Sequence, residues 1–333
     1  MLKDKICFIG VGQAGGNIVD LFTDLGYDSI VVNTQNSDSS YLNVTNKYII
    51  EEVSGFGHNR EKAKEYAYKH KEIILKQINS SIQDKEIVIV VFSAGGGTGS
   101  GIGTVISDLL SNKDNKEVCI VSAMPSYKEA LNIQVNAYKC LVDISNLKKI
   151  NSVFLIDNNK GDIISLNKKF ADLFDTFIKM SEISSIKGNV DDAEIKELLL
   201  TRGCSVLYKA DNADKLLEEY HENNIFVDIE NDRKIVYMGL STNSLIDYTY
   251  FYDKVGIPLD TFININDKFS FLILSGLSFP KLRAEKILSL INDRRKDVEE
   301  AINNSISDSI QDRLEWNVRA NKGVLLEDIF RKY

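Results

Sequence analysis

The chain has 333 residues, of which 44% are hydrophobic and 26% charged, with a formal net charge of −8 at neutral pH. This length predicts two domains that each bury a sizeable core, and the negative charge argues against extended direct contact with nucleic acid. No apolar run approaches the roughly 18 residues of a membrane-spanning helix, and the first residues do not have the pattern of a signal peptide.

Strand-like and helical patterns alternate along the first half of the chain. The predicted strands cover residues 5–9, 29–32, 47–51, 86–92, 117–124 and 152–156. This alternation predicts a parallel sheet flanked by helices, an α/β fold. Ligands bind such sheets at the carboxyl ends of the strands, so the loops that follow these strands are the candidate binding loops.

The second half predicts a long connecting helix and a smaller α+β domain. Apolar residues at helical spacing predict one helix from residue 163 to about 186, followed by strands at 205–209, 234–239 and 268–274. Two helices then follow, at 281–292 and from about 298 to 314, and a tail covers 321–333. The predicted division is therefore 1–162 for the nucleotide-binding domain, 163–187 for the connecting helix, 188–293 for the second domain, and 294–333 for a C-terminal surface helix and tail.

The last of these helices leaves two interpretations open. Its apolar residues recur every four positions, so the apolar stripe drifts by roughly 40° per step around the helix. Such a helix can lie across the body of its own chain, or its end can contact another subunit.

A run of glycines follows the fourth predicted strand. Residues 95–101 read Gly-Gly-Gly-Thr-Gly-Ser-Gly, between an apolar strand and an amphipathic helix. Ordered glycine is entropically costly, so this cluster between two regular elements is more than a flexible linker. Backbone N–H groups of such a loop, with the N-terminus of the following helix, form an anion site, which predicts a phosphate cradle.

Two familiar phosphate motifs do not account for this loop. No lysine occurs between Glu86 and Ser111, which excludes a P-loop. Residues 10–15 match Gly-x-Gly-x-x-Gly after the first strand, but the second strand ends in Asn33-Thr34-Gln35, without the acid that a dinucleotide ribose needs. A dinucleotide fold also leaves the second glycine loop unexplained, so an NAD(P)-type enzyme is a remote alternative.

The loop at 95–101 resembles the signature of the tubulin/FtsZ superfamily over all seven residues, and the order of elements is similar along nearly the whole chain. The resemblance implies a GTPase that binds GTP or GDP, with Mg²⁺ carried by the nucleotide and Gln13 as a possible metal contact. The residues that it assigns to the nucleotide are Gly12, Gln13, Ala14, Gly15 and Asn17 in the first loop, Asn33 after the second strand, Gly57 and His58 after the third, Gly95, Gly96, Gly97, Thr98, Gly99 and Ser100 in the main loop, Glu129 for the ribose, and Asn158, Phe170 and Asp175 for the base.

Several of these assignments have simpler alternatives. Gly12 and Gly15 also suit tight packing of a helix on a strand, residues 54–59 also suit an ordinary loop, and Glu129 also suits a solvated helix start. Ile133 stands where the family has an arginine that contacts the ribose, which argues against a standard division FtsZ. In the connecting helix, Phe174 falls at the family's polar base-reading position, so Asp175 is chosen, with Asp172 as an alternative.

The catalytic residues implied by the resemblance lie beyond the connecting helix. Residues 188–194 resemble the FtsZ Asn-x-Asp-x-x-Asp loop, with Glu194 in place of the last aspartate, as in tubulin α-subunits. In this family the loop of one subunit reaches the nucleotide of the next, which implies a head-to-tail filament with Asp191, Glu194 and Asn189 as the catalytic residues. The alternative is an acidic helix start whose carboxylates favour the helix dipole.

The compact chain and the Gly-Gln of the first loop resemble the TubZ type of plasmid and phage tubulins more than other branches. That resemblance implies partition of DNA through a DNA-binding adaptor of the TubR type at a centromere-like site, with indirect nucleic acid contact and no direct membrane contact. A cell-division or phage-positioning filament is the alternative. The three histidines have no ligand spacing, and the four cysteines, mostly in apolar runs, predict reduced thiols in a cytoplasmic protein.

Overall fold

The computed structural model of the chain describes residues 1–35, 39–50, 55–113, 115–183, 186–221, 224–230, 234–243, 247, 249–266 and 268–307. The predicted tail at 321–333 and the end of the last predicted helix lie outside the described residues.

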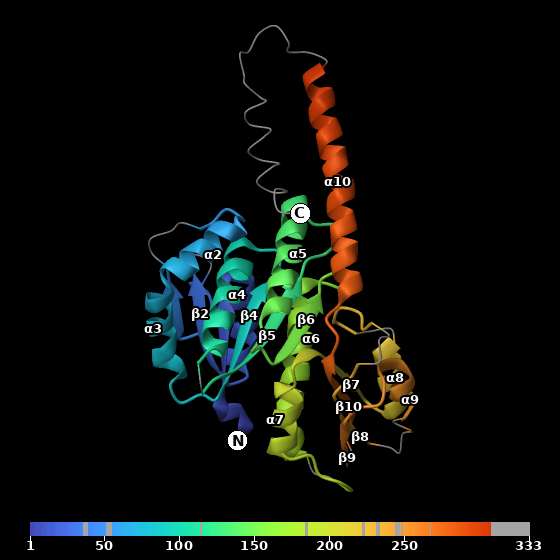
Figure 1. Ribbon diagram of the computed structural model, residues 1–333. Helices are drawn as coiled ribbons and strands as arrows, with labels where there is room; N and C mark the ends of the chain where they lie inside the picture. The colour runs from blue at the N-terminus through green and yellow to red at the C-terminus, as the bar shows by residue number, and fades with distance from the viewer. Residues whose placement is uncertain are drawn as a thin grey trace.

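The described strands form one mixed sheet in the order β3-β2-β1-β4-β5-β6-β7-β10-β8-β9 (Figure 1). The strands are β1 Ile6–Val11, β2 Asp28–Asn33, β3 Asn46–Ile49, β4 Ile87–Ser93, β5 Glu117–Met124, β6 Ser152–Asp157, β7 Gly203–Ala210, β8 Tyr237–Thr242, β9 Asp260–Ile265 and β10 Ser270–Leu277. Strands β1 to β6 pair in parallel, which confirms the predicted α/β class. Their central members are buried along almost their whole length, as expected for a sheet covered on both faces.

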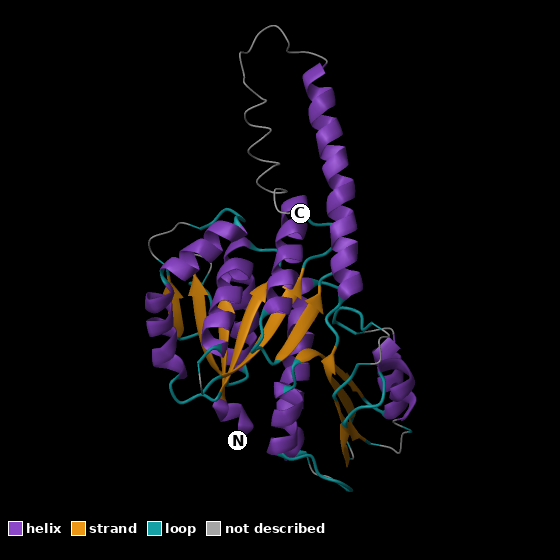
Figure 2. Cartoon of the chain, in the orientation of Figure 1, coloured by secondary structure: helices purple, strands orange, loops and turns teal. Residues whose placement is uncertain are grey.

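Helices flank this sheet (Figure 2). They are α1 Gly12–Asp24, α2 Arg60–Lys69, α3 Lys71–Ile82, α4 Gly97–Ser111, α5 Leu131–Asn146, α6 Ile163–Ile178, α7 Asp192–Leu200, α8 Ala213–His221, α9 Thr249–Val255 and α10 Lys281–Ser307, with 3₁₀ turns η1 Leu2–Lys5 and η2 Met180–Glu182. Helix α4 packs against both α2 and α5, α1 packs against α6, and α10 packs along α5.

The smaller region continues the sheet of the larger one. Strand β7 pairs in parallel with β6 only at Ser152 with Gly203 and at Val153 with Cys204. Strand β10 then runs antiparallel between β7 and β8. Strand β8 begins at Tyr237, later than predicted, and β9 was not predicted because its half-buried residues alternate weakly between polar and apolar.

The connecting helix is shorter than its predicted range. Helix α6 ends at Ile178, and η2 follows at once. The apolar positions of the helical pattern stop at Ile178, whereas Ile186 is 73% exposed. The backbone N–H of Ile186 donates to the carbonyl of Ile265 at 2.6 Å, so this residue runs along β9 instead of continuing the helix.

The two helices predicted after residue 280 are one. Helix α10 is continuous over 27 residues, because residues 293–297 contain neither glycine nor proline to end it. It runs beside α5 and then beyond the end of the sheet toward which the parallel strands point (Figure 1).

The four cysteines, Cys7, Cys119, Cys140 and Cys204, are buried and free, as predicted. Burial raises the pKa of each thiol to about 12, so all four are protonated near neutral pH. Within the described residues, no helix combines the length and the apolar character needed to cross a membrane.

Candidate nucleotide-binding site

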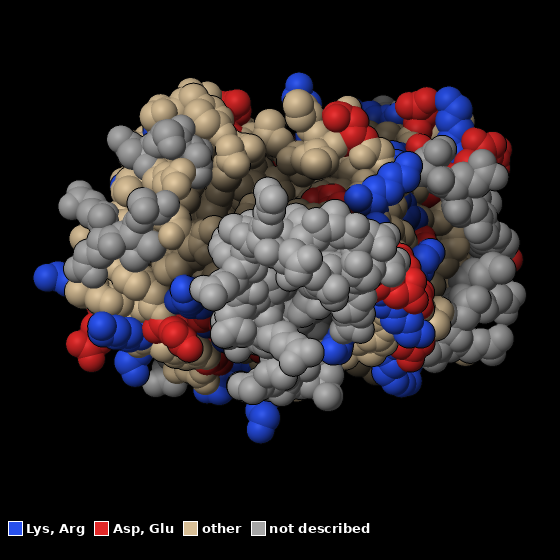
Figure 3. Space-filling view, turned by 90° about the horizontal axis from the view of Figure 1, so that it is seen from above, with Lys and Arg blue, Asp and Glu red and all other residues tan. Residues whose placement is uncertain are grey.

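A cavity of about 450 Å³ lies at the carboxyl ends of β1, β2 and β4, where the sequence predicts a ligand. Its wall comes from five of the predicted loops. The predicted residues that line it are Gly12, Gln13, Ala14, Asn33, Gly57, His58, Gly95, Gly96, Gly97, Thr98, Gly99 and Glu129. In the view onto this edge of the sheet, the surface left of the centre is hollowed and mostly uncharged (Figure 3).

The glycines let the loops approach one another more closely than side chains would allow. Gly12 has a φ of +71°, and a Cβ on it would lie 3.1 Å from the amide nitrogen of Gly99 in the second loop. A Cβ on Gly97 would lie 2.8 Å from two backbone carbons of His58. Three separate loops therefore meet backbone to backbone around the cavity.

The N-terminus of α4 opens at this cavity. Gly96 is the N-cap residue and supplies no side-chain acceptor for the first N–H groups of the helix. These groups and the helix dipole are available to an anion. Among the described lining residues there is no lysine or arginine, and Glu129 is the only carboxylate, so backbone N–H groups carry the positive potential of this site.

Two amide side chains at this edge each keep a buried atom without a partner among the described residues. Asn33 is 2% exposed, and its Oδ1 accepts from the amide of Thr34 at 2.8 Å, while its Nδ2 has no partner within the described structure. Asn158 follows β6, and its buried Oδ1 is also unpaired there. Orphan buried donors and acceptors are costly, so both atoms suit polar groups of a ligand.

The acid predicted for the ribose lines the cavity. Glu129 Oε1 accepts from the amide of Ser126 at 2.8 Å, which folds the loop after β5 around the carboxylate. Ile133, one turn further, also lines the cavity. A Cβ on Gly95 would lie 2.4 Å from Ile133 Cγ2, so this side chain closes against the glycine loop at the arginine position of the related family.

Six predicted contacts do not line the cavity: Gly15, Asn17, Ser100, Asn158, Phe170 and Asp175. A Cβ on Gly15 would lie 2.2 Å from the carbonyl oxygen of Val91, so Gly15 allows α1 to pack on β4, the simpler alternative for this residue. Asn17 is exposed, and its Oδ1 accepts from the hydroxyl of Tyr41 at 2.7 Å. The hydroxyl of Ser100 donates to the carbonyl of Gly96 within α4.

The structure contradicts the prediction that Phe170 stacks on the base. Its side chain is 0% exposed. Its ring packs among four others, from Phe22, Phe154, Phe174 and Phe226, with centroids 5.9 to 6.1 Å away. No face of the ring is left for a ligand, and Phe170 belongs to the aromatic core between α1, α6 and β6.

Asp175 also lies away from the cavity. Its carboxylate accepts from the hydroxyl of Tyr27 at 3.0 Å and pairs with Lys179 at 2.8 Å. Tyr27 immediately precedes β2, so this contact lies at the amino end of the strands. Helix α6 starts at the carboxyl edge and has risen roughly 18 Å by this residue. The length of the helix therefore places this acid at the opposite edge of the sheet from the cavity.

A residue that holds the cavity loops together was not predicted from the sequence. Asn136, 4% exposed on α5, donates from Nδ2 to the carbonyl of His58 at 2.9 Å and to that of Gly95 at 3.1 Å. It thereby ties two cavity loops to one helix. The available signal was a polar residue on the apolar face that also carries Cys140 and Ile144.

Replacing Asn136 by alanine is expected to lower the free energy of unfolding by about 1 to 3 kcal/mol, because the buried carbonyl of Gly95 and the part-buried carbonyl of His58 lose their donor. Urea unfolding measures this change. Asn132→Ala, on the exposed face of the same helix, is the matched control and should change little. Equal midpoints for both variants would contradict the bridging role of Asn136.

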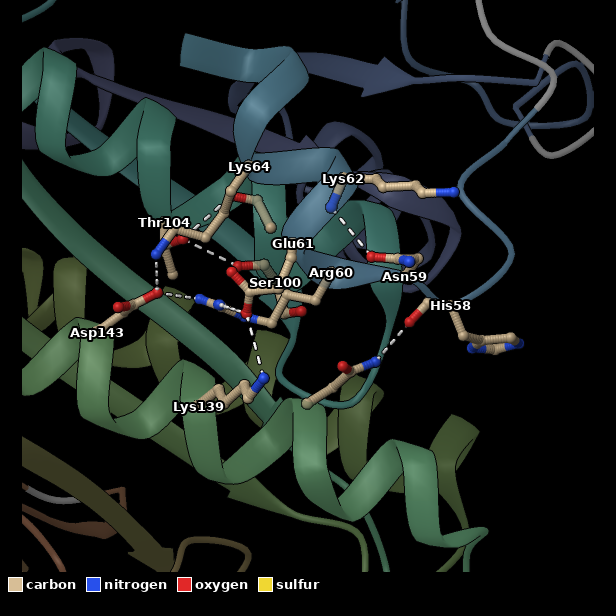
Figure 4. Close-up of polar contacts among 12 residues, drawn as sticks. His58, Asn59, Arg60, Glu61, Lys62, Lys64, Ser100, Thr104, Lys139 and Asp143 are labelled. Carbon is tan, nitrogen blue, oxygen red and sulfur yellow. Dashed lines mark hydrogen bonds and ion pairs between the residues drawn. The ribbon is translucent and has the colours of Figure 1, made fainter. Parts of the chain in front are cut away.

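A charged cluster fixes the helix that follows the loop at 55–59. Arg60, 2% exposed at the start of α2, pairs with Asp143 of α5, which also accepts from Lys64 at 2.6 Å (Figure 4). Burial opposes the charge of Asp143, but the two cations outweigh it and hold the pKa of this carboxyl below its usual value. The cluster therefore joins α2 to α5 behind the cavity.

The sign of this pKa shift predicts acid-sensitive stability. The folded state binds a proton at Asp143 less readily than the unfolded state, so the stabilisation exists above the unfolded pKa near 3.9 and is lost as the pH falls further. Asp143→Asn is expected to lower the free energy of unfolding by about 1 to 2 kcal/mol at pH 7. The difference in this free energy between the variant and wild type should become smaller below about pH 4. Urea titrations across this range measure it, with the exposed Asp297→Asn as control. A gap that is constant with pH would rule the ion pair out as its cause.

The predicted catalytic acids form a capping box at the start of α7. Asp191 Oδ1 accepts from the amides of Ala193 at 2.8 Å and Glu194 at 2.9 Å, and Glu194 Oε2 accepts from the amide of Asp191 at 3.0 Å. Within a single chain, these acids therefore act as the start of a helix, as the alternative interpretation expects. Asn189 and Asp191 are exposed and Glu194 is half-buried, so the second carboxylate oxygens can still reach another molecule.

These acids lie at the opposite edge of the sheet from the cavity. Lys196 of α7 pairs with Glu86 at 3.0 Å, and Glu86 directly precedes β4. The cavity lies beyond the other end of β4, a strand of 7 residues, which spans about 23 Å. One chain cannot bring Asp191 or Glu194 to its own cavity.

The chain is similar to proteins of one family. Residues 5–164 match the model of the Tubulin/FtsZ family, GTPase domain. The chain is 33% identical to the tubulin-like protein TubZ of Clostridium botulinum C phage over 315 residues, or 91% of this chain and 87% of that protein. The tail-truncated TubZ of Clostridium botulinum phage c-st has a similar structure, with a TM-score of 0.82 at 32% identity over 89% of this chain and 100% of that one. The two-stranded TubZ-Bt filament, at 15% identity, shares the fold with a TM-score of 0.78 over 94% of this chain and 95% of that one.

Proposed function

The chain belongs to the tubulin/FtsZ family, and we propose that it forms head-to-tail filaments whose subunits bind GTP in the cavity at the carboxyl ends of β1, β2 and β4. The observation that carries this proposal is the pairing of a phosphate cradle at one edge of the sheet with acids at the other. The reaction is hydrolysis of GTP to GDP and phosphate.

The cradle suits the phosphates through its backbone. The N–H groups of residues 96–99 and of the loop after β1 surround the anion, and Thr98 adds a hydroxyl. The orphan Nδ2 of Asn33 is a further donor in the wall. Mg²⁺, when bound with the nucleotide, would neutralise phosphate charge, and Gln13 lines the cavity where it can contact the metal or a phosphate.

The nucleoside would lie toward β5 and β6. Glu129 suits the two ribose hydroxyls as an acceptor, and the orphan Oδ1 of Asn158 suits a donor on the edge of guanine. The packing of Phe170 and Asp175 argues against a contact of either side chain with the base.

Hydrolysis would be completed by the next subunit in the filament. Stacking the edge that carries α7 of one chain onto the cavity edge of another brings Asp191, Glu194 and Asn189 to the γ-phosphate. The carboxylates would orient the attacking water and accept its proton, and Asn189 would hold it in line. The separation of about one strand length within a chain supports this arrangement.

The cellular role that we favour is partition of plasmid or phage DNA in the cytoplasm. The similarity to TubZ of a Clostridium botulinum phage supports it. The net charge of −8 favours contact with DNA through a basic adaptor of the TubR type over direct binding. A cell-division or phage-positioning filament would use the same site with other partners.

Turnover as a function of protein concentration tests this function. We expect GTP to make the protein sediment, and turnover per chain to rise steeply above the concentration at which sedimentation begins. Phosphate release and pelleting are measured on the same samples, with GDP as the control nucleotide. A turnover per chain that is the same below and above this concentration would rule out completion by a neighbour.

A further inference from the structure

Helix α10 holds the loop that carries the ribose acid. Arg294 donates from Nη2 to the carbonyl of Tyr127 at 2.7 Å and from Nη1 to the carbonyl of Glu129 at 2.5 Å. About three turns before it on the same helix, Arg283 donates to the carbonyl of Pro125 at 2.7 Å. Three carbonyls of one five-residue loop thus accept from two arginines of α10.

The inner arginine is buried and paired. Arg283 is 4% exposed and lies 3.2 Å from the carboxylate of Asp157, at the end of β6. Its guanidinium also lies 3.9 Å from the ring centroid of Tyr127, and the ammonium of Lys286 lies 4.5 Å from the same centroid. A buried guanidinium with an acidic partner and a ring face is a fixed anchor.

The same anchor reaches the base side of the cavity. Asp157 Oδ1 accepts from the backbone amide of Asn159 at 3.0 Å and from its Nδ2 at 2.7 Å. Asn159 Oδ1 then accepts from the amide of Tyr127 at 2.9 Å and from the hydroxyl of Ser126 at 3.2 Å. The loops after β5 and β6 are therefore one hydrogen-bonded unit whose outer wall is α10.

We propose that α10 positions the nucleotide-binding carboxylate, with Arg283 and Arg294 as positioning residues that hold Glu129 against the ribose of the bound nucleotide. This inference rests on the proposed function. The side-chain Oε1 of Glu129 accepts a hydrogen bond from the amide of Ser126, and the backbone carbonyl of Glu129 accepts one from Arg294. The part of α10 beyond Arg294 extends past the sheet (Figure 1).

Arg294→Gln tests the proposal, because Arg294 does not line the cavity and Arg283 remains as the anchor. The assay measures the dissociation constants of fluorescent GDP and 2′-deoxy-GDP on unassembled protein. We expect wild type to prefer GDP, and Arg294→Gln to weaken GDP about tenfold but 2′-deoxy-GDP, which keeps only the 3′-hydroxyl as a donor to Glu129, clearly less. Lys296→Gln removes one positive charge from an exposed position of the same helix and should bind both nucleotides as wild type does.

A double variant separates positioning from a merely structural role. Glu129→Gln alone should lose the same preference for GDP, and adding Arg294→Gln to it should cost little more, because both changes remove one contact. The proposal is overturned if Arg294→Gln binds GDP as tightly as the Lys296→Gln control does. It is also overturned if Arg294→Gln loses the same affinity for GDP and for 2′-deoxy-GDP, or if the wild-type protein binds both nucleotides equally well. A wild type that binds no guanine nucleotide overturns the proposed function instead.

Discussion

Glu194→Gln is expected to lower GTP turnover in assembled filaments by about a hundredfold or more, with nucleotide binding unchanged. Glutamine keeps an oxygen that can accept from the amide of Asp191, so the capping box and the start of α7 are retained. Only the basic carboxylate is lost. Phosphate release is measured on sedimented filaments, which should also persist longer after GTP is consumed.

The control for this change lies one turn along the same helix. Glu197 accepts from the hydroxyl of Tyr237 at 2.6 Å, and a glutamine there can also accept, so Glu197→Gln should hydrolyse GTP as wild type does. Glu194→Ala removes the cap together with the carboxylate and should be no faster than Glu194→Gln. If filaments of Glu194→Gln hydrolyse GTP at the wild-type rate, Glu194 is not catalytic and serves only to cap α7.

Gly97→Ala is expected to lower the free energy of unfolding by about 3 kcal/mol and to weaken GDP binding tenfold or more. The added Cβ would lie 2.8 Å from the Cα and carbonyl carbon of His58 and 3.0 Å from the amide of Asn59. All three are backbone atoms that Asn136 helps to hold, so the loops must separate. Urea unfolding and calorimetric titration with GDP measure the two effects.

The neighbouring glycine provides the control for stability. Gly96 has a φ of −73°, and a Cβ there meets nothing closer than the carbonyl of Ser93 at 3.9 Å. The free energy of unfolding of Gly96→Ala should therefore lie within about 0.5 kcal/mol of the wild-type value. If both variants unfold alike, the close approach of the two loops is not a feature of the protein in solution.

The glycine loops could be predicted from the sequence because their chemistry is local. A glycine cluster between a buried strand and a helix already contains the backbone donors of a phosphate site. The conformation of this loop depends little on the rest of the chain, and residues 95–99 line the cavity as expected. The parallel sheet follows from alternating patterns for the same reason.

The base contacts, and the arginines behind the ribose loop, depend on tertiary placement, which local sequence patterns do not specify. Phe170 and Asp175 were assigned by motif alignment, but the aromatic core and the length of α6 decide where their side chains lie. Arg283 contacts a residue 158 positions earlier in the chain, and no local pattern indicates such a pair. Asn136 was also missed, although a polar residue on an apolar helix face is a signal.

The distance between the cavity edge and α7 also determines how many complete catalytic centres a linear assembly contains. Two stacked chains contain two cavities but complete only one catalytic centre, since the cavity at the free end faces solvent. Turnover per chain would then be half its limiting value in a dimer and would approach that limit as the number of chains grows. Every filament would keep one terminal nucleotide that its own acids never reach, whatever its length or age.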